Sequence, residues 1–196
     1  MRIVAGAQRG RALVAPKGHS TRPTADRTRQ ALFNVLEHAA WSPGLADVRV
    51  VDLFAGSGAL GLEAISRGGE FCLFADSDPA ALAAIDANIE ALRLTGRCAA
   101  RRLDAGRLPP LASDSAPFDL AFLDPPYARG LAEPALAGLL AGGWLAPGGL
   151  AVVERGAGEG GFAPPGFAVL DDRAWGAARV WFLRPSSTSD RLLTAF

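Results

Sequence analysis

The chain has 196 residues, of which 49% are hydrophobic and 20% are charged, and its formal net charge is zero. These values are typical of one well-packed globular domain and exclude a disordered or fibrous chain. The longest apolar runs are far shorter than a membrane span, and the N-terminus has no signal-peptide core, so we expect a cytoplasmic protein. The two cysteines, Cys72 and Cys98, have no metal-binding spacing, so we expect buried thiols and no metal site.

Although the net charge is zero, the N-terminal segment is basic. Residues 1–30 contain seven basic residues against one acid, Asp26, whereas the rest of the chain contains thirteen basic and nineteen acidic residues. A basic segment on an acidic body favours a polyanionic partner, although a solvated hairpin would have the same charges. The candidate contacts to a polyanion are Arg2, Arg9, Arg11, Lys17, Arg22, Arg27 and Arg29.

In chain order, the first predicted element is a β-hairpin over residues 2–15, with Gln8-Arg9-Gly10 at its middle. A helix capped by Thr24 or Asp26 follows and ends near His38. Apolar runs and helical repeats then alternate. They predict strands at residues 48–54, 71–75, 98–103 and 118–123, and helices at residues 59–67, 79–94 and 133–140.

In the last third of the chain, Pro147-Gly148-Gly149 predicts a turn into a strand at residues 150–154. Residues 167–171 and 178–183 predict an antiparallel pair. Strands alternating with helices predict an α/β fold, a mostly parallel sheet with helices on both faces. We expect three units, which are a basic hairpin at residues 1–20, the sheet domain at residues 21–184 and a flexible tail at residues 185–196.

A glycine-rich loop follows the first predicted strand of the sheet. Residues 56–61, GSGALG, match G-x-G-x-x-G and open a helix, and Asp76 ends the next strand twenty residues after Gly56. Glycines allow a sharp turn and close approach of the backbone to a ligand. A carboxylate at the end of the next strand, such as that of Asp76, can bind ribose hydroxyls. The pattern therefore predicts a ligand that contains a nucleoside. A dinucleotide cofactor fits it as well as any other ligand that contains adenosine.

Asp52 and Asp104 distinguish between these ligands. Asp52 lies close to where a dinucleotide would place its pyrophosphate, which a carboxylate repels. It suits a ligand with a nearby ammonium group, as in the methionine half of S-adenosylmethionine, unless it only caps a helix or pairs with an arginine. Asp104 ends the third strand and is placed to bind an adenine amino group beside the Ala105 amide, although such a residue alone is more often a turn former.

The apolar run over residues 118–123 ends in Asp124-Pro125-Pro126-Tyr127. An exocyclic amine on a base is a poor nucleophile until it becomes pyramidal, and acceptors that hold its N–H groups in that geometry favour the transition state. The Asp124 carboxylate and the Pro125 carbonyl suit this role, and the Tyr127 ring can stack on an unstacked base. Alone, the motif would indicate an ordinary loop, but it follows the fourth strand of a predicted cofactor site.

These motifs resemble one family. The stretches RPTADRTRQALFNVL, VDLFAGSGALGLEA and LDPPYARG are similar to those of bacterial 16S ribosomal RNA guanine-N2 methyltransferases, within the class I S-adenosylmethionine-dependent enzymes. The resemblance implies a Rossmann-like, seven-stranded sheet with an antiparallel last strand. It also implies that the basic residues above contact 16S rRNA, in the small ribosomal subunit or its assembly intermediate, and it places Arg22, Pro23 and Thr24 near the methionine end of the cofactor.

The resulting site predictions cover two groups of residues. The catalytic residues are Asp124, Pro125, Pro126 and Tyr127. The residues expected to bind S-adenosylmethionine are Asp52, Phe54, Ala55, Gly56, Ser57, Gly58, Gly61, Asp76, Ser77, Asp104, Ala105, Arg22 and Thr24. We expect a monomer.

Three other functions remain open at this point. A DNA adenine-N6 or cytosine-N4 methyltransferase shares the glycine loop and the DPPY motif. Such an enzyme normally has a sizeable target-recognition region, whereas only a short hairpin precedes the predicted sheet domain of this chain. A nicotinamide-dependent oxidoreductase explains the loop and Asp76 but leaves Asp52 and DPPY unexplained. A non-catalytic RNA-binding module explains the basic segment alone.

Overall fold

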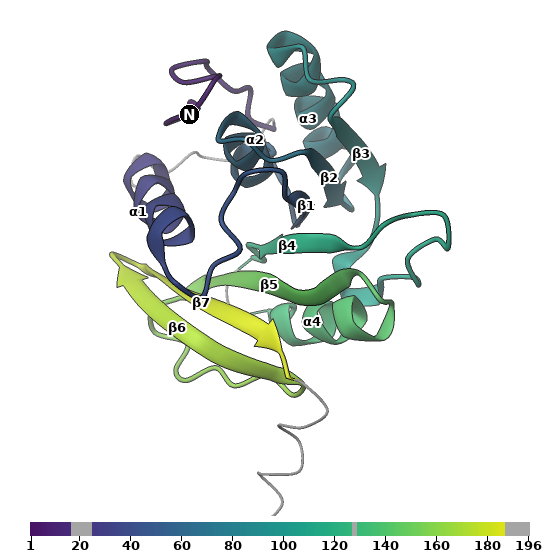
Figure 1. Cartoon of the computed structure of the whole chain (residues 1–196). Coiled ribbons are helices and arrows are strands. Elements are labelled where there is room, and N and C mark those ends of the chain that lie inside the picture. Colours follow the sequence, from purple (N-terminus) through teal and green to yellow (C-terminus); the bar gives the residue numbers. More distant parts are fainter. Residues whose placement is uncertain (17–24, 127–128, 187–196) are drawn as a thin grey trace, which may run out of the picture.

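Seven strands form one sheet in the order β3-β2-β1-β4-β5-β7-β6 (Figure 1). The structure is a computed structural model, which describes residues 1–16, 25–126 and 129–186. The strands are β1 Arg49–Leu53, β2 Phe71–Asp76, β3 Cys98–Arg102, β4 Phe118–Leu123, β5 Leu145–Gly156, β6 Phe167–Trp175 and β7 Ala178–Pro185.

The first five strands are parallel, and β7 runs antiparallel to both β5 and β6. The predicted seven-stranded α/β sheet with an antiparallel last strand is confirmed. From β1 the chain builds outward to β2 and β3, and then returns to the other side of β1 with β4 and β5. The strand order therefore reverses between β1 and β4, which is where ligands bind in open α/β sheets.

Helices cover both faces of the sheet because the strands are apolar on both sides. The helices α1 Ala25–His38, α2 Ala59–Ser66 and α3 Pro79–Leu92 pack on one face, in a cluster that includes Phe33, Leu62 and Ile85. The helix α4 Ala132–Ala141 and the short 3-10 helix η1 Ala105–Arg107 pack on the other. Within the described ranges, no helix is both long and apolar enough to cross a membrane.

The start of β5 differs from the sequence prediction. The segment 147–149, expected to be a turn before the strand, lies inside β5, where the pairing with β4 shifts between Phe118 and Leu120. Gly148 has φ +79°, and a Cβ on Gly149 would lie 2.9 Å from the Ala146 carbonyl oxygen. Glycines therefore allow the strand to bulge here instead of ending, and the prediction of a turn was wrong.

The N-terminal hairpin, defined here as residues 1–14, contains an antiparallel bridge between Arg2 and Ala12 but no regular strand. The Ile3 amide donates to the Arg11 carbonyl at 3.0 Å. Ile3 is fully buried and Leu13 is 8% exposed, and both belong to the same core cluster as α2 and α3. The hairpin thus packs as part of the helical layer, and the division of the chain at residues 20 and 184 stays a prediction.

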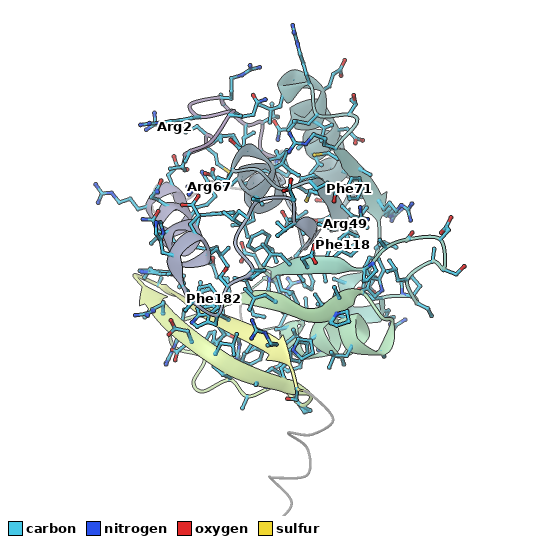
Figure 2. The ribbon with its side chains drawn as sticks, viewed as in Figure 1. Arg2, Arg49, Arg67, Phe71, Phe118 and Phe182 are labelled. Carbon is cyan, nitrogen blue, oxygen red and sulfur yellow. The ribbon has the colours of Figure 1, made fainter. Side chains whose placement is uncertain are left out.

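The amino-terminal edge of the sheet, where the parallel strands begin, has a separate cluster of one arginine and two aromatic rings. The Arg49 guanidinium lies over the rings of Phe71 and Phe118, 5.0 and 5.4 Å from their centroids (Figure 2). A surface cavity of about 470 Å³ opens beside Arg49 and Phe71 and is also lined by Asp47 and Arg97. Because acidic and basic side chains both line it, this cavity has no charge preference that would identify a ligand.

Candidate active site

Four acids lie at the opposite edge, at the carboxyl ends of four adjacent strands. Asp76 is the last residue of β2, Asp52 is the last but one of β1, Asp124 directly follows β4, and Asp104 follows β3. Since β3, β2, β1 and β4 are neighbouring parallel strands, these ends meet along one edge. The structure therefore places along one edge the four acids that the sequence singled out, with Asp52 and Asp124 on the two strands between which the strand order reverses.

The glycine loop lies between β1 and α2 and depends on left-handed backbone conformations. Gly56 and Gly58 have φ +56° and +76°, and Phe54 adopts φ +59°, which is unusual for a residue with a side chain. The Gly56 amide donates to Asp76 Oδ2 at 2.9 Å, and Asp76 Oδ1 accepts from the Asp78 amide at 2.9 Å. The Asp76 carboxylate thereby fixes the loop against the start of α3.

The third glycine of the motif allows α2 to pack closely on β2. A Cβ on Gly61 would lie 2.4 Å from Phe74 Cε1 and 2.5 Å from Cys72 Sγ. Both neighbours are fully buried, so they have little room to move. Gly61 is required by packing, whereas a Cβ on Gly56 would meet only the Phe54 carbonyl oxygen, at 4.0 Å.

Asp52 is 2% exposed, and its Oδ2 accepts a hydrogen bond from the Gly61 amide at 2.9 Å. The interpretation in which this acid caps a helix is therefore part of its role. Burial raises the pKa of Asp52 well above its ordinary value, the Gly61 amide opposes this shift, and the charges of Asp124 and Asp76 add to it. Three carboxyl groups thus interact at this edge, which disfavours an anionic ligand and favours a cationic one.

Asp104 is exposed and caps η1, with Oδ1 accepting from the Gly106 amide at 2.9 Å. Its interpretation as a turn former is thus also part of its role. Ala105 is 4% exposed directly beside it. On the adjacent strand end, Ser77 is exposed, and its carbonyl oxygen accepts from Arg102 Nε at 3.3 Å.

Beyond β4, Asp124 and Pro126 are exposed and Pro125 is buried. A small cavity beside the two prolines is also lined by Arg129 and Glu154, so the start of α4 and the end of β5 border this part of the site. Some residues of the prediction lie outside the described residues, and their placement stays a prediction. They are Lys17, Arg22, Pro23, Thr24 and Tyr127.

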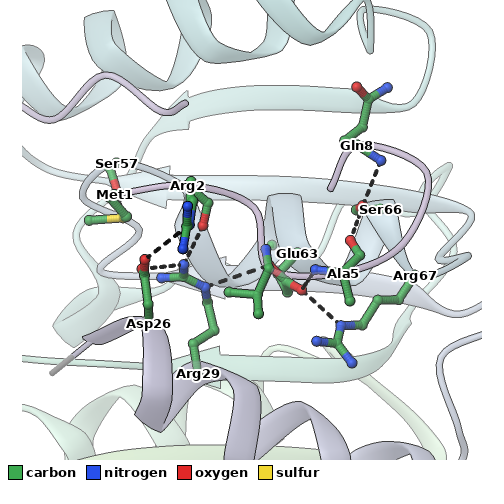
Figure 3. Close-up of polar contacts among 12 residues, drawn as sticks. Met1, Arg2, Ala5, Gln8, Asp26, Arg29, Ser57, Glu63, Ser66 and Arg67 are labelled. Carbon is green, nitrogen blue, oxygen red and sulfur yellow. Dashed lines mark hydrogen bonds and ion pairs between the residues drawn. The ribbon is translucent and has the colours of Figure 1, made fainter. Parts of the chain in front are cut away.

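The basic residues of the N-terminal segment divide into two groups. Arg2, Arg9, Arg11 and Arg27 are exposed. Arg29, by contrast, is only 4% exposed, and its guanidinium donates to Asp26 Oδ1 at 2.8 Å and to the Arg2 carbonyl (Figure 3). The prediction that Arg29 contacts RNA is therefore corrected, because this side chain is buried and bound within the protein.

Comparisons with known proteins show the family of this chain. A sequence profile of the family described as conserved hypothetical protein 95 matches residues 1–184. The ribosomal RNA small subunit methyltransferase D of Escherichia coli strain K12 is 38% identical over 154 residues, which are 79% of this chain and 74% of that protein. The chain belongs to the ribosomal RNA small subunit methyltransferase D family.

Two further relatives extend the match over nearly the whole chain. Methyltransferase D of Haemophilus influenzae is 33% identical over 180 residues, which are 90% of this chain and 89% of that protein. A solved structure from Escherichia coli, which is described as a methyltransferase, superposes with a TM-score of 0.79 at 31% identity and covers 96% of this chain and 99% of that one. The family match from residue 1 also includes the N-terminal hairpin.

In this methyltransferase D family member, sequence reasoning missed two buried polar residues that hold the hairpin, Asn88 and Glu63. Glu63 is fully buried, and its carboxylate accepts from the Val4 and Ala5 amides at 2.7 and 2.9 Å and pairs with Arg67 at 2.9 Å (Figure 3). The signal that could have found it is an acid within the otherwise apolar helix segment LGLEAI. Asn88 has no comparable signal, because the charged residues Asp86 and Glu90 lie near it in the same helix segment.

Proposed function

We propose that the protein transfers a methyl group from S-adenosylmethionine to the exocyclic N2 amine of a guanine in 16S rRNA of the small ribosomal subunit. The observation that carries this proposal is the meeting of Asp52, Asp76 and Asp124 at the glycine loop, with Asp104 on the next strand end. Membership of a family whose named relatives are small-subunit ribosomal RNA methyltransferases supports the same substrate class.

The residues of the loop fit this cofactor better than a dinucleotide. S-adenosylmethionine supplies a methyl group on a sulfonium, and it also carries an ammonium group. Asp76 and Asp124 beside the buried Asp52 create negative potential that attracts these cationic groups and repels a pyrophosphate, and a nearby cation favours the ionised form of Asp52. This electrostatic argument disfavours the nicotinamide-dependent oxidoreductase. Space beside Gly56 lets a ligand approach the backbone closely.

Each acid has a distinct role in the proposal. The Asp76 carboxylate keeps lone pairs beyond its two backbone bonds and would bind the ribose hydroxyls. Asp104, with the Ala105 amide, would bind the adenine. Arg22 and Thr24 would lie near the methionine end, as the family resemblance implies.

The substrate amine would be held at the end of β4. The Asp124 carboxylate and the Pro125 carbonyl would accept hydrogen bonds from its N–H groups and stabilise the pyramidal nitrogen that attacks the methyl carbon. Tyr127 would stack on the guanine. Alignment of nitrogen, carbon and sulfur supplies much of the remaining rate enhancement.

The alternative is a DNA amino methyltransferase, which would use the same acid edge. Incubation of the protein with labelled S-adenosylmethionine and small-subunit particles, naked 16S rRNA or duplex DNA separates the two functions. We expect label in the ribosomal particles or their RNA and none in the DNA. Label in duplex DNA alone would replace the proposed substrate, and label in none of the three would contradict the proposal.

A further inference from the structure

The N-terminal hairpin lies across α2 and α3. Its Met1 end contacts the glycine loop directly, and its Val14 end is linked to the loop through Asn88. On α2, the Ala7 amide donates to the Ser66 carbonyl at 2.7 Å, and Ser66 Oγ donates to the Ala5 carbonyl at 2.6 Å. A Cβ on Gly6 would lie 1.9 Å from the Ser66 carbonyl oxygen, so the hairpin and α2 are in direct backbone contact. These contacts fix residues 5–7 of the hairpin against α2.

Asn88 of α3 fixes Val14, at the end of the hairpin, and also binds the glycine loop. Its side chain is 1% exposed, and its Oδ1 accepts from the Val14 amide at 2.8 Å. Its Nδ2 donates to the Val14 carbonyl at 2.9 Å and to the Ser57 carbonyl at 3.0 Å. Both amide hydrogens are therefore used, and one of them joins α3 to the middle of the loop.

A second contact joins the same loop residue, Ser57, to Met1 at the start of the hairpin. Ser57 Oγ donates to Met1 Sδ at 3.3 Å (Figure 3). Ser57 is 8% exposed and lies between the two left-handed glycines, Gly56 and Gly58. Ser57 thus contacts Met1 directly and is linked to Val14, at the other end of the hairpin, through Asn88.

The loop is held from the sheet side by Asp76 and from the helix side by Asn88. Gly58 is the N-cap of α2 and provides no side-chain hydrogen bond. Asp52 holds the first turn of the helix through the Gly61 amide, while Asn88 holds the Ser57 carbonyl. The Asn88 side chain therefore links the position of Val14 to that of the Ser57 carbonyl.

We infer that Asn88 is a positioning residue that couples the N-terminal hairpin to the cofactor loop, so that RNA bound to the hairpin and cofactor bound to the loop strengthen each other. This inference rests on the proposed function, because it takes the loop as the cofactor site. Coupling of this kind is reciprocal in binding free energy, and because it acts through Asn88 we expect cofactor binding to stabilise the hairpin contacts as well.

Amide hydrogen exchange tests the coupling without RNA. We expect S-adenosylhomocysteine, the product form of the cofactor, to slow exchange of the Ile3, Leu13 and Val14 amides of the wild-type protein by about fivefold or more. In Asn88→Ala these amides should exchange at nearly the same rate with and without the ligand. Ser57→Ala, which keeps the Ser57 carbonyl but removes the contact to Met1, should retain part of the protection.

The ratio of exchange rates with and without ligand distinguishes coupling from simple destabilisation. If Asn88 only stabilised the fold, Asn88→Ala would raise both rates and leave their ratio as in the wild type. The matched control is Asn34→Ala, an exposed asparagine on α1 whose side chain accepts from Gln30 of the same helix, and it should keep the wild-type ratio.

Calorimetry supplies the second measurement. Wild-type affinity for S-adenosylhomocysteine should rise about fivefold or more when naked 16S rRNA is present, and that gain should vanish in Asn88→Ala. Ligand binding to wild type with no change in the hairpin amides and no gain with RNA would overturn the coupling and leave the proposed function standing. Wild-type protein that binds no cofactor would overturn the proposed function and the coupling with it.

Discussion

At Asp52, ligand binding and folding favour different forms of one carboxyl group. It is 2% exposed and within electrostatic reach of Asp76 and Asp124. A charge there attracts a cationic cofactor, but burial away from water destabilises the charged form. Buried acids of this kind are typical of functional sites rather than of cores chosen for stability.

Replacement of Asp52 by asparagine tests this conflict. The folded-state pKa of Asp52 is raised, so the wild type loses stability as pH rises from the ordinary carboxyl pKa through the raised one. The asparagine side chain cannot ionise and can still accept from the Gly61 amide, so Asp52→Asn should melt higher than wild type at neutral pH. The difference should disappear in acid, below the ordinary carboxyl pKa. Thermal unfolding from pH 3 to pH 8 measures it, and parallel curves would refute the account.

Asp76 provides the test of cofactor binding. Without charge-assisted hydrogen bonds to the ribose, Asp76→Asn should bind S-adenosylmethionine more weakly by about 1.5–3 kcal/mol. Asparagine is preferable to alanine because it can still accept from the Gly56 amide. Asp119→Asn is the matched control, since Asp119 accepts from the Arg49 amide at the opposite edge. Calorimetry in which both variants bind as wild type does would remove Asp76 from the site.

Tyr127 separates stacking from hydrogen bonding at the substrate. If its ring stacks on the guanine, Tyr127→Ala should weaken substrate binding by roughly 1–3 kcal/mol, whereas Tyr127→Phe should be mild. Cofactor affinity should stay as in wild type for both. Equal effects in the two variants, measured as KM for ribosomal particles, would show that the hydroxyl is required and that stacking is the wrong explanation.

At the scale of elements, the site depends on the close packing of α2 on β2. The third glycine of the motif serves this contact, because Phe74 and Cys72 occupy the space that a side chain on Gly61 would need. The carboxylates of Asp52 and Asp76 then bind amides of the loop and the helix that follow β1. Contacts with β1 and β2 therefore contribute to the loop geometry, together with those from Asn88 and Met1.

The variant Gly61→Ala should push α2 away from β2. Overpacking of this size should destabilise the fold by about 1–3 kcal/mol and weaken cofactor binding as the loop moves. Gly158→Ala is the control, because a Cβ there meets nothing within 4 Å. Denaturant unfolding compares the two, and a Gly61→Ala protein as stable as Gly158→Ala would show that the packing is looser than the distances indicate.

The elements could be predicted well where local pattern determines structure, and poorly where distant partners do. Strands buried on both faces appear as apolar runs, and Asp78 with Pro79 marks the start of α3. The bonds from Glu63 and Asn88 to the hairpin join residues 58 to 74 positions apart, which no local pattern reveals. Charge alone likewise could not show that Arg29 is buried while Arg27 is exposed.

At the scale of the whole molecule, the exposed arginines of the N-terminal segment are proposed to hold the RNA backbone. A hairpin this short buries too little of a base to specify it, so we propose that the shape of the ribosomal particle selects the target. Arg11 also donates to the Ala91 carbonyl at 2.6 Å, near the C-terminal end of α3. Its side chain is therefore held in place over that helix.

Salt dependence measures these phosphate contacts. Arg9→Ala combined with Arg11→Ala should reduce the slope of log binding constant against log salt by about 0.7–0.9 for each phosphate contact that the variant removes. The reduction should be similar for different RNA sequences. Arg173→Ala, which removes an exposed arginine on β6, is the control and should keep the wild-type slope. Identical slopes for the double variant and wild type would mean that RNA is held by another surface.

The most direct test of the central claim is the identity of the methylated nucleoside. Small-subunit particles would be incubated with labelled S-adenosylmethionine and either wild type or Asp124→Asn, and their RNA digested to nucleosides for mass spectrometry. We predict labelled N2-methylguanosine with wild type and none with Asp124→Asn, although the variant binds the cofactor. Label on an adenine or cytosine amine, or equal N2-methylguanosine with both proteins, would contradict the account.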